Sequence, residues 1–181
     1  LLGPYIKIIE DLKSYPEIDE IEETGRTFEE NASLKASAVG EFLGENSLVL
    51  SDDSGLEVCA LSGEPGVFSA RYAGENASDD ENRKKLLQKL NEIDSDMSDW
   101  SASFKCVMTL VKGSNKLATF EGSVQGTICD EERGENGFGY DSIFIPEGYE
   151  NTFAELPSET KNSISHRYRA LEAFKKWLSE V

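Results

Sequence analysis

The sequence predicts a single α/β domain over residues 1–181. A chain of 181 residues is long enough for one domain with a substantial core. Stretches with helical periodicity alternate along the chain with short apolar runs that are typical of strands. Glycine, proline, aspartate and serine separate these stretches, and no internal repeat or low-complexity segment interrupts them.

The composition argues against several classes of protein. The net charge of −17 disfavours binding to nucleic acid or to an anionic membrane surface. No stretch approaches the roughly 20 apolar residues of a membrane helix, and the start does not resemble a signal peptide. The 3 cysteines form no CxxC pair, which indicates reduced thiols and a cytoplasmic protein. No GxxxxGK[ST] segment is present, so a P-loop enzyme is excluded.

The chain begins as if it continued an earlier element. Leu1 and Leu2 resemble the end of a helix, Gly3-Pro4 the turn after it, and residues 5–9 a strand. We therefore expect that an N-terminal strand and helix are missing from this chain.

The first predicted helix covers residues 28–43. Thr27 and Glu30 form a capping-box signature, and apolar residues recur on one face of the helix. Lys35 falls on that same face. A lysine there either extends its ammonium to solvent or meets an anion, and an inward ammonium would suit a site for phosphate and metal.

The next segment combines strand residues with turn residues. The apolar run 48–50 leads to Asp52, Asp53, Ser54 and Gly55, and a second apolar run follows. We expect a strand, a sharp turn and a second strand, with the polar side chains at the mouth of a sheet. Adjacent carboxylates repel each other unless a cation or a proton joins them, which favours a metal or general-base site. An ordinary polar turn is the alternative.

The second half of the chain continues the alternation. We expect a helix at 78–93, a polar linker at 94–99, a hairpin of strands at 102–111 and 117–128, and a strand at 142–145. The stretch 133–141 places three glycines around Phe138 and Tyr140 and ends on Asp141. A loop that exposes aromatic rings can be a stacking platform for a planar ligand, and a floppy surface loop is the alternative.

The last predicted helix begins with an unusual pair of residues. Ser165 is the expected N-cap of a helix that runs to about residue 180. His166, which is the only histidine, and Arg167 then occupy its first turn, where cations oppose the helix dipole. An anion or an acceptor-rich ligand at the helix start would explain both residues, and a solvent-facing pair is the alternative.

Seven segments carry a resemblance to one family. They are Glu-Glu-Thr-Gly-x-Thr-Phe-x-Glu-Asn-Ala at 22–32, Lys35, Ser-Asp-Asp-Ser-Gly-Leu at 51–56, Pro-Gly-Val-Phe-Ser-Ala-Arg-Tyr-Ala-Gly at 65–74, Phe-Gly-Tyr-Asp at 138–141, Lys161 and Ser-His-Arg at 165–167. Together they closely resemble the inosine triphosphate pyrophosphatases, also called Ham1-like proteins. The resemblance covers nearly the whole chain.

The resemblance implies an elongated α/β fold with a mixed central sheet flanked by helices, and a homodimer. It implies Mg²⁺-dependent hydrolysis of ITP, dITP and XTP, three non-standard purine nucleoside triphosphates, to the monophosphate and pyrophosphate. Asp53 would bind the metal and act as general base, and Glu22 would be the second metal ligand. Glu23 and Asp52 are the neighbours that compete for these assignments.

The same resemblance implies the substrate contacts. Lys35 and Ser54 would hold the phosphates, and Phe138 would stack on the purine. The residues that it places around the base edge are Gly139, Tyr140, Asp141, Lys161, His166 and Arg167.

One feature of the family has no counterpart in this sequence. The family begins with a strand followed by a Ser/Thr-x-Asn-x-x-Lys loop that grips the triphosphate, and no segment here matches that loop. A nucleotide-binding module without catalysis is therefore one alternative function. The other is a dimeric aspartic protease built on Asp53-Ser54-Gly55, whose chemistry needs two such carboxylates.

Overall fold

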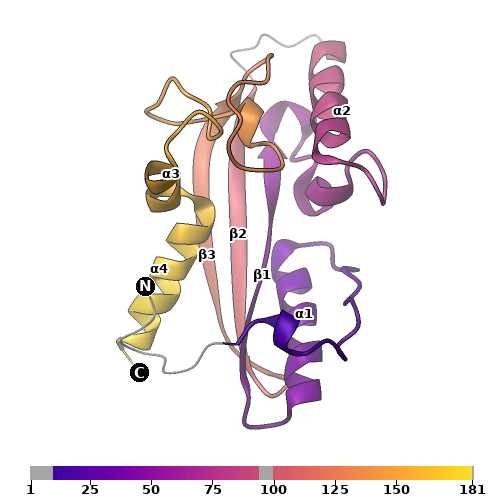
Figure 1. Cartoon of the computed structure of the whole chain (residues 1–181), viewed down its shortest axis with the longest axis vertical. Helices are drawn as coiled ribbons and strands as arrows, with labels where there is room; N and C mark the ends of the chain where they lie inside the picture. The colour runs from indigo at the N-terminus through magenta and orange to yellow at the C-terminus, as the bar shows by residue number, and fades with distance from the viewer. Residues whose placement is uncertain (1–9, 94–99, 181) are drawn as a thin grey trace. The chain divides into compact units, whose positions relative to one another are not determined.

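The structure is a computed structural model that describes residues 10–93 and 100–180 (Figure 1). Its longer helices are α1 (Phe28–Leu43), α2 (Asp79–Glu92), α3 (Ser158–Ile164) and α4 (His166–Leu178), and its strands are β1 (Leu48–Val58), β2 (Ser101–Lys112), β3 (Asn115–Ile128) and β4 (Phe144–Pro146). The α/β class is confirmed. The strand expected at 5–9 and the linker expected at 94–99 lie outside the described residues.

The four strands form one sheet in the order β1-β2-β3-β4. Strands β3 and β4 pair antiparallel, with Gly126 opposite Pro146. The Gly113 N–H, just after β2, donates to the carbonyl of Ser47, just before β1, so these two strands are also antiparallel. The parallel component of the expected mixed sheet is therefore not found among these four strands.

The chain divides into two compact units. The first consists of Leu1–Asp53, Val107–Glu121 and Arg169–Val181, and the second of Ser54–Cys106 and Gly122–Tyr168. The prediction of a single domain stays a prediction. Within residues 10–93 and 100–180, no helix combines the length and the apolar character needed to span a membrane.

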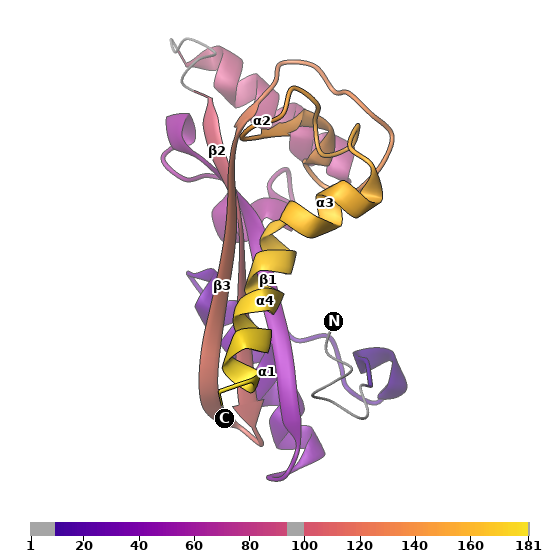
Figure 2. The same cartoon turned by 90° about the vertical axis from the view of Figure 1, so that its left-hand side faces the viewer.

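In the first unit, helices cover both faces of the sheet. Neighbouring residues of β3 show this directly, because successive side chains of a strand point to opposite faces. The Thr119 hydroxyl lies 3.4 Å from the Glu29 carboxylate of α1. The Phe120 ring packs 5.1 Å from the Phe174 ring of α4, which runs alongside β3 in Figure 2. Helix α1 therefore lies on one face and α4 on the other.

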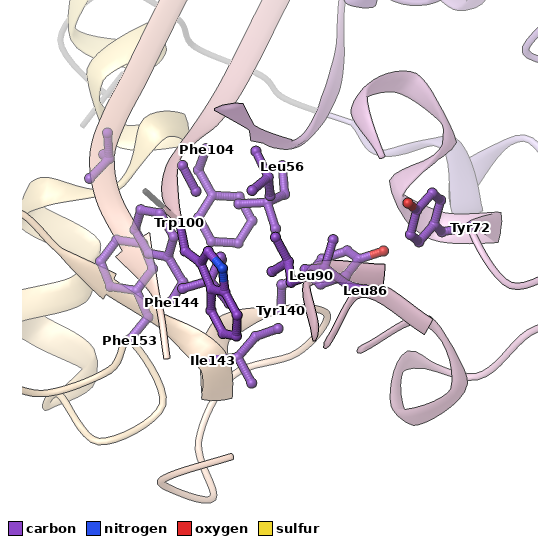
Figure 3. Close-up of a cluster of buried hydrophobic side chains, with 14 of the residues drawn as sticks. Leu56, Tyr72, Leu86, Leu90, Trp100, Phe104, Tyr140, Ile143, Phe144 and Phe153 are labelled. Carbon is purple, nitrogen blue, oxygen red and sulfur yellow. The ribbon is translucent and has the colours of Figure 1, made fainter. Parts of the chain in front are cut away.

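The second unit has its own apolar core, shown in Figure 3. The Phe104 ring of β2 makes an edge contact at 4.7 Å with Phe144 and stacks at 5.9 Å on Phe153. Leu86 and Leu90 of α2 are fully buried in the same cluster. This core supports the loops that carry the aromatic residues at 138–141.

Strand β1 corrects one expectation from the sequence. Asp52, Asp53, Ser54 and Gly55 do not form a sharp turn, because they lie inside one continuous strand of 11 residues. The preference of aspartate, serine and glycine for turns is weak. Hydrogen-bonded pairing with a neighbouring strand outweighs it. The protease alternative also loses its catalytic loop, since its Asp-Ser-Gly segment is part of the sheet.

The observed helices agree more closely with those predicted from the sequence. Helix α1 has the predicted bounds, and the Thr27 hydroxyl accepts a hydrogen bond from the Glu30 N–H as expected. The Ser165 hydroxyl accepts from the Tyr168 N–H at 3.2 Å, which confirms Ser165 as the N-cap of α4. The short helix α3 just before it was not predicted.

Candidate active site

Asp53 is held by a buried asparagine of α1. The Asp53 side chain is mostly buried, and its Oδ2 atom accepts a hydrogen bond from the Asn31 side-chain amide at 2.9 Å. The side-chain oxygen of Asn31, Oδ1, accepts a hydrogen bond from the Gly25 N–H at 2.7 Å. Asn31 is fully buried. It therefore fixes the carboxylate and also ties it to the segment that contains Glu22 and Glu23.

Lys35 lies between two carboxylates. Its ammonium is 2.5 Å from Glu23 and 3.9 Å from Asp53, and about a quarter of its side chain is exposed, 24%. The inward orientation is therefore confirmed over extension to solvent, and the anions it meets are carboxylates. Without that positive charge, two acids this close together would repel each other.

This arrangement fits a magnesium ion together with a phosphate ligand. Mg²⁺ takes oxygen ligands, keeps several waters and commonly uses only one or two carboxylates plus phosphate oxygens. No group of three or more acids, histidines or cysteines converges in the described part of the chain. Asp53 and Glu23 supply two carboxylates, whereas the Glu22 side chain is exposed. The geometry thus favours Glu23 over Glu22 as the carboxylate close to Asp53.

A cavity of about 800 Å³ opens beside these groups in the first unit. Its polar wall includes Glu23, Lys35 and Ser51, and Val39 and Leu43 of α1 contribute to its apolar wall. This volume falls within the range of small-molecule sites, ~300–1,000 Å³.

In the second unit, a glycine-flanked loop displays an aromatic ring. Gly137 and Gly139 have φ angles of +83° and +59°, which side-chain-bearing residues rarely adopt. Phe138 stands between them and is 63% exposed. Asp141 is buried and closes the loop by accepting from the Phe138 N–H at 2.8 Å. The stacking-platform interpretation therefore has a rigid loop and an open ring to support it.

Two cations lie over that ring. The Lys161 ammonium is 5.2 Å and the Arg167 guanidinium 5.5 Å from the Phe138 centroid. Lys161 also pairs with the buried Asp141 carboxylate at 2.5 Å. Arg167 donates to the Ser54 hydroxyl at 2.7 Å, and Ser54 follows Asp53 directly in the chain. Cation–π contact and ion pairing together order this cluster.

His166 is a buried, neutral member of the same cluster. Its ring stacks on Phe104 with centroids 4.9 Å apart and planes 10° apart, and it is only 5% exposed. Burial, with a smaller contribution from the charges of Arg167 and Lys161, lowers the pKa of His166 to about 3. Arg167 lies 3.3 Å from Nε2, so Nε2 is the acceptor and Nδ1 carries the proton. Within the described residues Nδ1 has no hydrogen-bond partner.

These residues line a cavity of about 280 Å³ in the second unit. Its wall includes Ser54, Phe104, Phe138, Gly139, Tyr140, Asp141, Lys161, His166 and Arg167. All the base-edge residues expected from the sequence are therefore brought together. The walls combine aromatic rings with both donors and acceptors, which suits a planar heterocycle.

Sequence reasoning missed three residues that organise these sites. Asn31 could have been found, because at 100° per residue it falls on the same helix face as Lys35. Asp79 and Arg83 of α2 contact Gly139, about 60 positions further along the chain, and no local pattern signals that contact.

Comparison with known proteins agrees with this arrangement. Residues 1–177 match the Ham1 family. A dITP/XTP pyrophosphatase of Bacillus cereus is 48% identical over 174 residues, covering 95% of this chain and 83% of that protein. A dITP/XTP pyrophosphatase of Halalkalibacterium halodurans is 46% identical over 181 residues, covering 98% and 90%.

Solved structures give the same result. A HAM1 protein from Coxiella burnetii matches with a TM-score of 0.85 and 47% identity, covering 91% of this chain and 83% of that one. The Ham1 protein of Staphylococcus aureus matches with a TM-score of 0.84 and 46% identity, covering 93% and 85%. A match of this extent, in sequence and in backbone, leads to one conclusion: the chain belongs to the Ham1 family.

Proposed function

We propose that this protein hydrolyses ITP, dITP and XTP to the nucleoside monophosphate and pyrophosphate. The observation that carries the proposal is the exposed Phe138 ring beneath Lys161 and Arg167, with Arg167 hydrogen-bonded to the residue that follows the buried carboxylate Asp53. The relatives from Bacillus cereus and Halalkalibacterium halodurans are named dITP/XTP pyrophosphatases, which supports two of these three substrates.

Asp53 and the residues around it would perform the hydrolysis. Asp53 would accept a proton from the water that attacks the α-phosphorus, and pyrophosphate would leave. The buried Asn31 amide holds the Asp53 carboxylate in one orientation for that task. Lys35 and Ser54 would bind phosphate oxygens and offset the charge that develops on them.

We further propose Mg²⁺ as the cofactor, held by Asp53 and by one of Glu22 and Glu23. When bound, it would neutralise phosphate charge and make a bound water more acidic. The position of Lys35 between two carboxylates supports this proposal, because the same carboxylates already attract a cation.

Phe138 and the residues around it would select the purine base. Phe138 would stack on the purine, and donors aimed at O6 would reject adenine, which carries an amino group at that position. The N–H groups of Phe138, Gly139 and Asp141 already have acceptors inside the protein. We therefore assign O6 to the Arg167 guanidinium and the Tyr140 N–H.

We also propose that the protein is a cytoplasmic homodimer. The cysteines support the location, since all three are free thiols, as expected in a reducing compartment. The dimer is carried over from the family resemblance, and light scattering coupled to gel filtration tests it. An elution mass of about 40 kDa, twice the 20.0 kDa of the chain, is expected.

Pyrophosphate release from a panel of nucleoside triphosphates tests the function. ITP, dITP and XTP should be consumed much faster than ATP in Mg²⁺. Asp53→Asn should lower kcat by a factor of about 10³ or more while the fold is retained. Glu57→Gln is the matched control, because Glu57 is another carboxylate of β1 and forms an ion pair with Lys105 at 2.6 Å. Nucleotide binding without turnover in the wild type would establish the binding-module alternative instead.

A further inference from the structure

Helix α2 fixes the backbone on both sides of the Gly139 Cα. Asp79, the first residue of the helix, accepts a hydrogen bond from the Gly139 N–H at 2.6 Å. Arg83, one turn later, donates to the Gly139 carbonyl at 2.7 Å. The first of these peptide groups is the one that joins Phe138 to Gly139. Two charged side chains of one helix therefore set the orientation of the backbone next to the exposed ring.

The clamp adds to the restraint that Asp141 already provides. The Asp141 carboxylate accepts from the Phe138 N–H at 2.8 Å, and the Asp141 N–H donates to the Phe138 carbonyl at 3.2 Å, but neither bond fixes the Gly139 peptide groups. Phe138 has a glycine on each side, and glycine loses more conformational freedom on ordering than any other residue. The Phe138 ring is 63% exposed, so packing against the core does not hold it. A ring in that setting samples several orientations unless its backbone is fixed.

Arg83 is itself held in place. The Arg83 Nε atom lies 2.9 Å from the Glu132 carboxylate, and only 16% of the Arg83 side chain is exposed. Glu132 in turn lies 3.2 Å from the Ser142 hydroxyl. Asp79 lines the same cavity as Phe138. Arg83 is therefore a restrained, mostly buried part of the site, and Asp79 reaches the Gly139 N–H from the wall of the same cavity.

We propose that Asp79 and Arg83 are positioning residues that preorganise Phe138 for stacking on the purine base. This inference rests on the proposed function, since it assumes that the base stacks on Phe138. The pair acts before binding, by removing the cost of ordering the loop when the nucleotide arrives. Loss of the clamp therefore weakens nucleotide binding. It leaves kcat unchanged, because the groups around Asp53 are not touched.

The same helix offers a matched control. Asp80 and Lys84 are an acid and a base one position after Asp79 and Arg83 in α2. They form an ion pair with each other at 2.6 Å. Both are exposed. Asp79→Ala and Asp80→Ala remove the same charge from the same first turn of the helix, so they have similar effects on the helix dipole and on the net charge. Only Asp79→Ala removes a contact to Gly139.

Calorimetric binding of IMP and steady-state hydrolysis of ITP test the proposal. Asp79→Ala and Arg83→Gln should each raise the Kd for IMP and the KM for ITP about tenfold, with kcat within about twofold of wild type. Asp80→Ala and Lys84→Gln should change all three values by less than about twofold. Equal Kd values for Asp79→Ala and Asp80→Ala, or a loss confined to kcat, would overturn the proposal.

A double mutant shows whether the clamp acts through the ring. In a Phe138→Ala background, Asp79→Ala should add less than about twofold to the Kd, because the ring it positions is gone. A full tenfold effect in that background would refute the positioning role. Asp79→Asn keeps a hydrogen-bond acceptor and should recover most of the affinity, which covers the case in which Asp79→Ala fails to fold. A wild type that binds IMP but leaves ITP intact would refute the proposed function and leave this comparison valid.

Discussion

At the scale of single residues, the catalytic proposal depends on the hydrogen bond that the buried Asn31 amide donates to the Asp53 carboxylate. Asn31 donates to Asp53 and accepts from the Gly25 N–H, so its side chain is satisfied only in this arrangement. The sequence identified Asp53 and Lys35 from residue type and helix face. It did not identify Asn31, although Asn31 shares the helix face of Lys35, because nothing in the sequence shows which distant strand that face contacts.

Replacement of Asn31 by aspartate should shift the pH dependence of the enzyme. A second carboxylate 2.9 Å from Asp53 would disfavour the charged form of both and raise the pKa of Asp53. We expect the acidic limb of the kcat/KM profile for ITP to move to higher pH by about one unit or more. An acidic limb at the wild-type position would contradict the role given to Asp53.

Replacement of Asn31 by alanine should act differently. It leaves the partly buried Gly25 N–H without its Asn31 acceptor and should cost about 1–3 kcal/mol of unfolding free energy in urea titrations. Activity should fall without a shift of the pH profile. The two substitutions thus separate electrostatic from structural effects at one position.

His166 should make the protein less stable as the pH falls. Its folded-state pKa of about 3 lies below the ordinary value of 6.5, so the unfolded chain binds the proton more readily. The contribution is complete above pH 6.5 and declines toward pH 3, by about 1.4 kcal/mol per pH unit. Urea unfolding of wild type and His166→Phe between pH 7.5 and 5 measures it, because the chain has no other histidine. A difference between the two proteins that stays constant across this range would contradict the burial of a neutral ring.

At the scale of elements, local signals predicted the longer helices and the hairpin of β2 and β3, but not the continuity of strand β1 or the short helix α3. The apolar spacing of α1 lies within its own 16 residues and its capping residue, Thr27, directly precedes them, so its bounds were predicted correctly. Strand β1 was expected to break at Asp52-Asp53-Ser54-Gly55. It continues because pairing with a neighbouring strand, which is distant in sequence, outweighs the turn preference of those residues.

Helix α1 also lies very close to the β2–β3 turn, and the sequence does not reveal this contact. A Cβ atom on Gly40 would come within 1.7 Å of the Gly113 carbonyl oxygen in the β2–β3 turn. Gly40→Ala should therefore destabilise the protein by about 1–3 kcal/mol, although glycine to alanine usually stabilises a helix. Thermal unfolding measures the change, and Ser37→Ala on the same helix is the control. A higher melting temperature for Gly40→Ala would contradict the packing of α1 against this turn.

At the scale of the whole molecule, the residues named in the proposed function come from both compact units. Asp53 and Lys35 belong to the first unit, and Phe138 and Arg167 to the second. The chain passes from one unit to the other between Asp53 and Ser54. The base-edge residues were predicted as a set from the family motifs, whereas the α2 residues that hold Gly139 required the tertiary structure.

Hydrogen exchange with a non-hydrolysable ITP analogue tests that assignment. In the presence of Mg²⁺, peptides covering Asp53 and peptides covering 137–141 should both exchange more slowly when the analogue is bound. Protection confined to one unit would show that a single nucleotide does not engage both sets of groups.

The position of water attack tests the central claim most directly. The protein is allowed to hydrolyse ITP in water enriched in ¹⁸O, and the products are analysed by mass spectrometry. Attack at the α-phosphorus, with Asp53 as the base, predicts one ¹⁸O atom in IMP and none in pyrophosphate. Label in pyrophosphate, or IDP and orthophosphate as the products, would contradict the account.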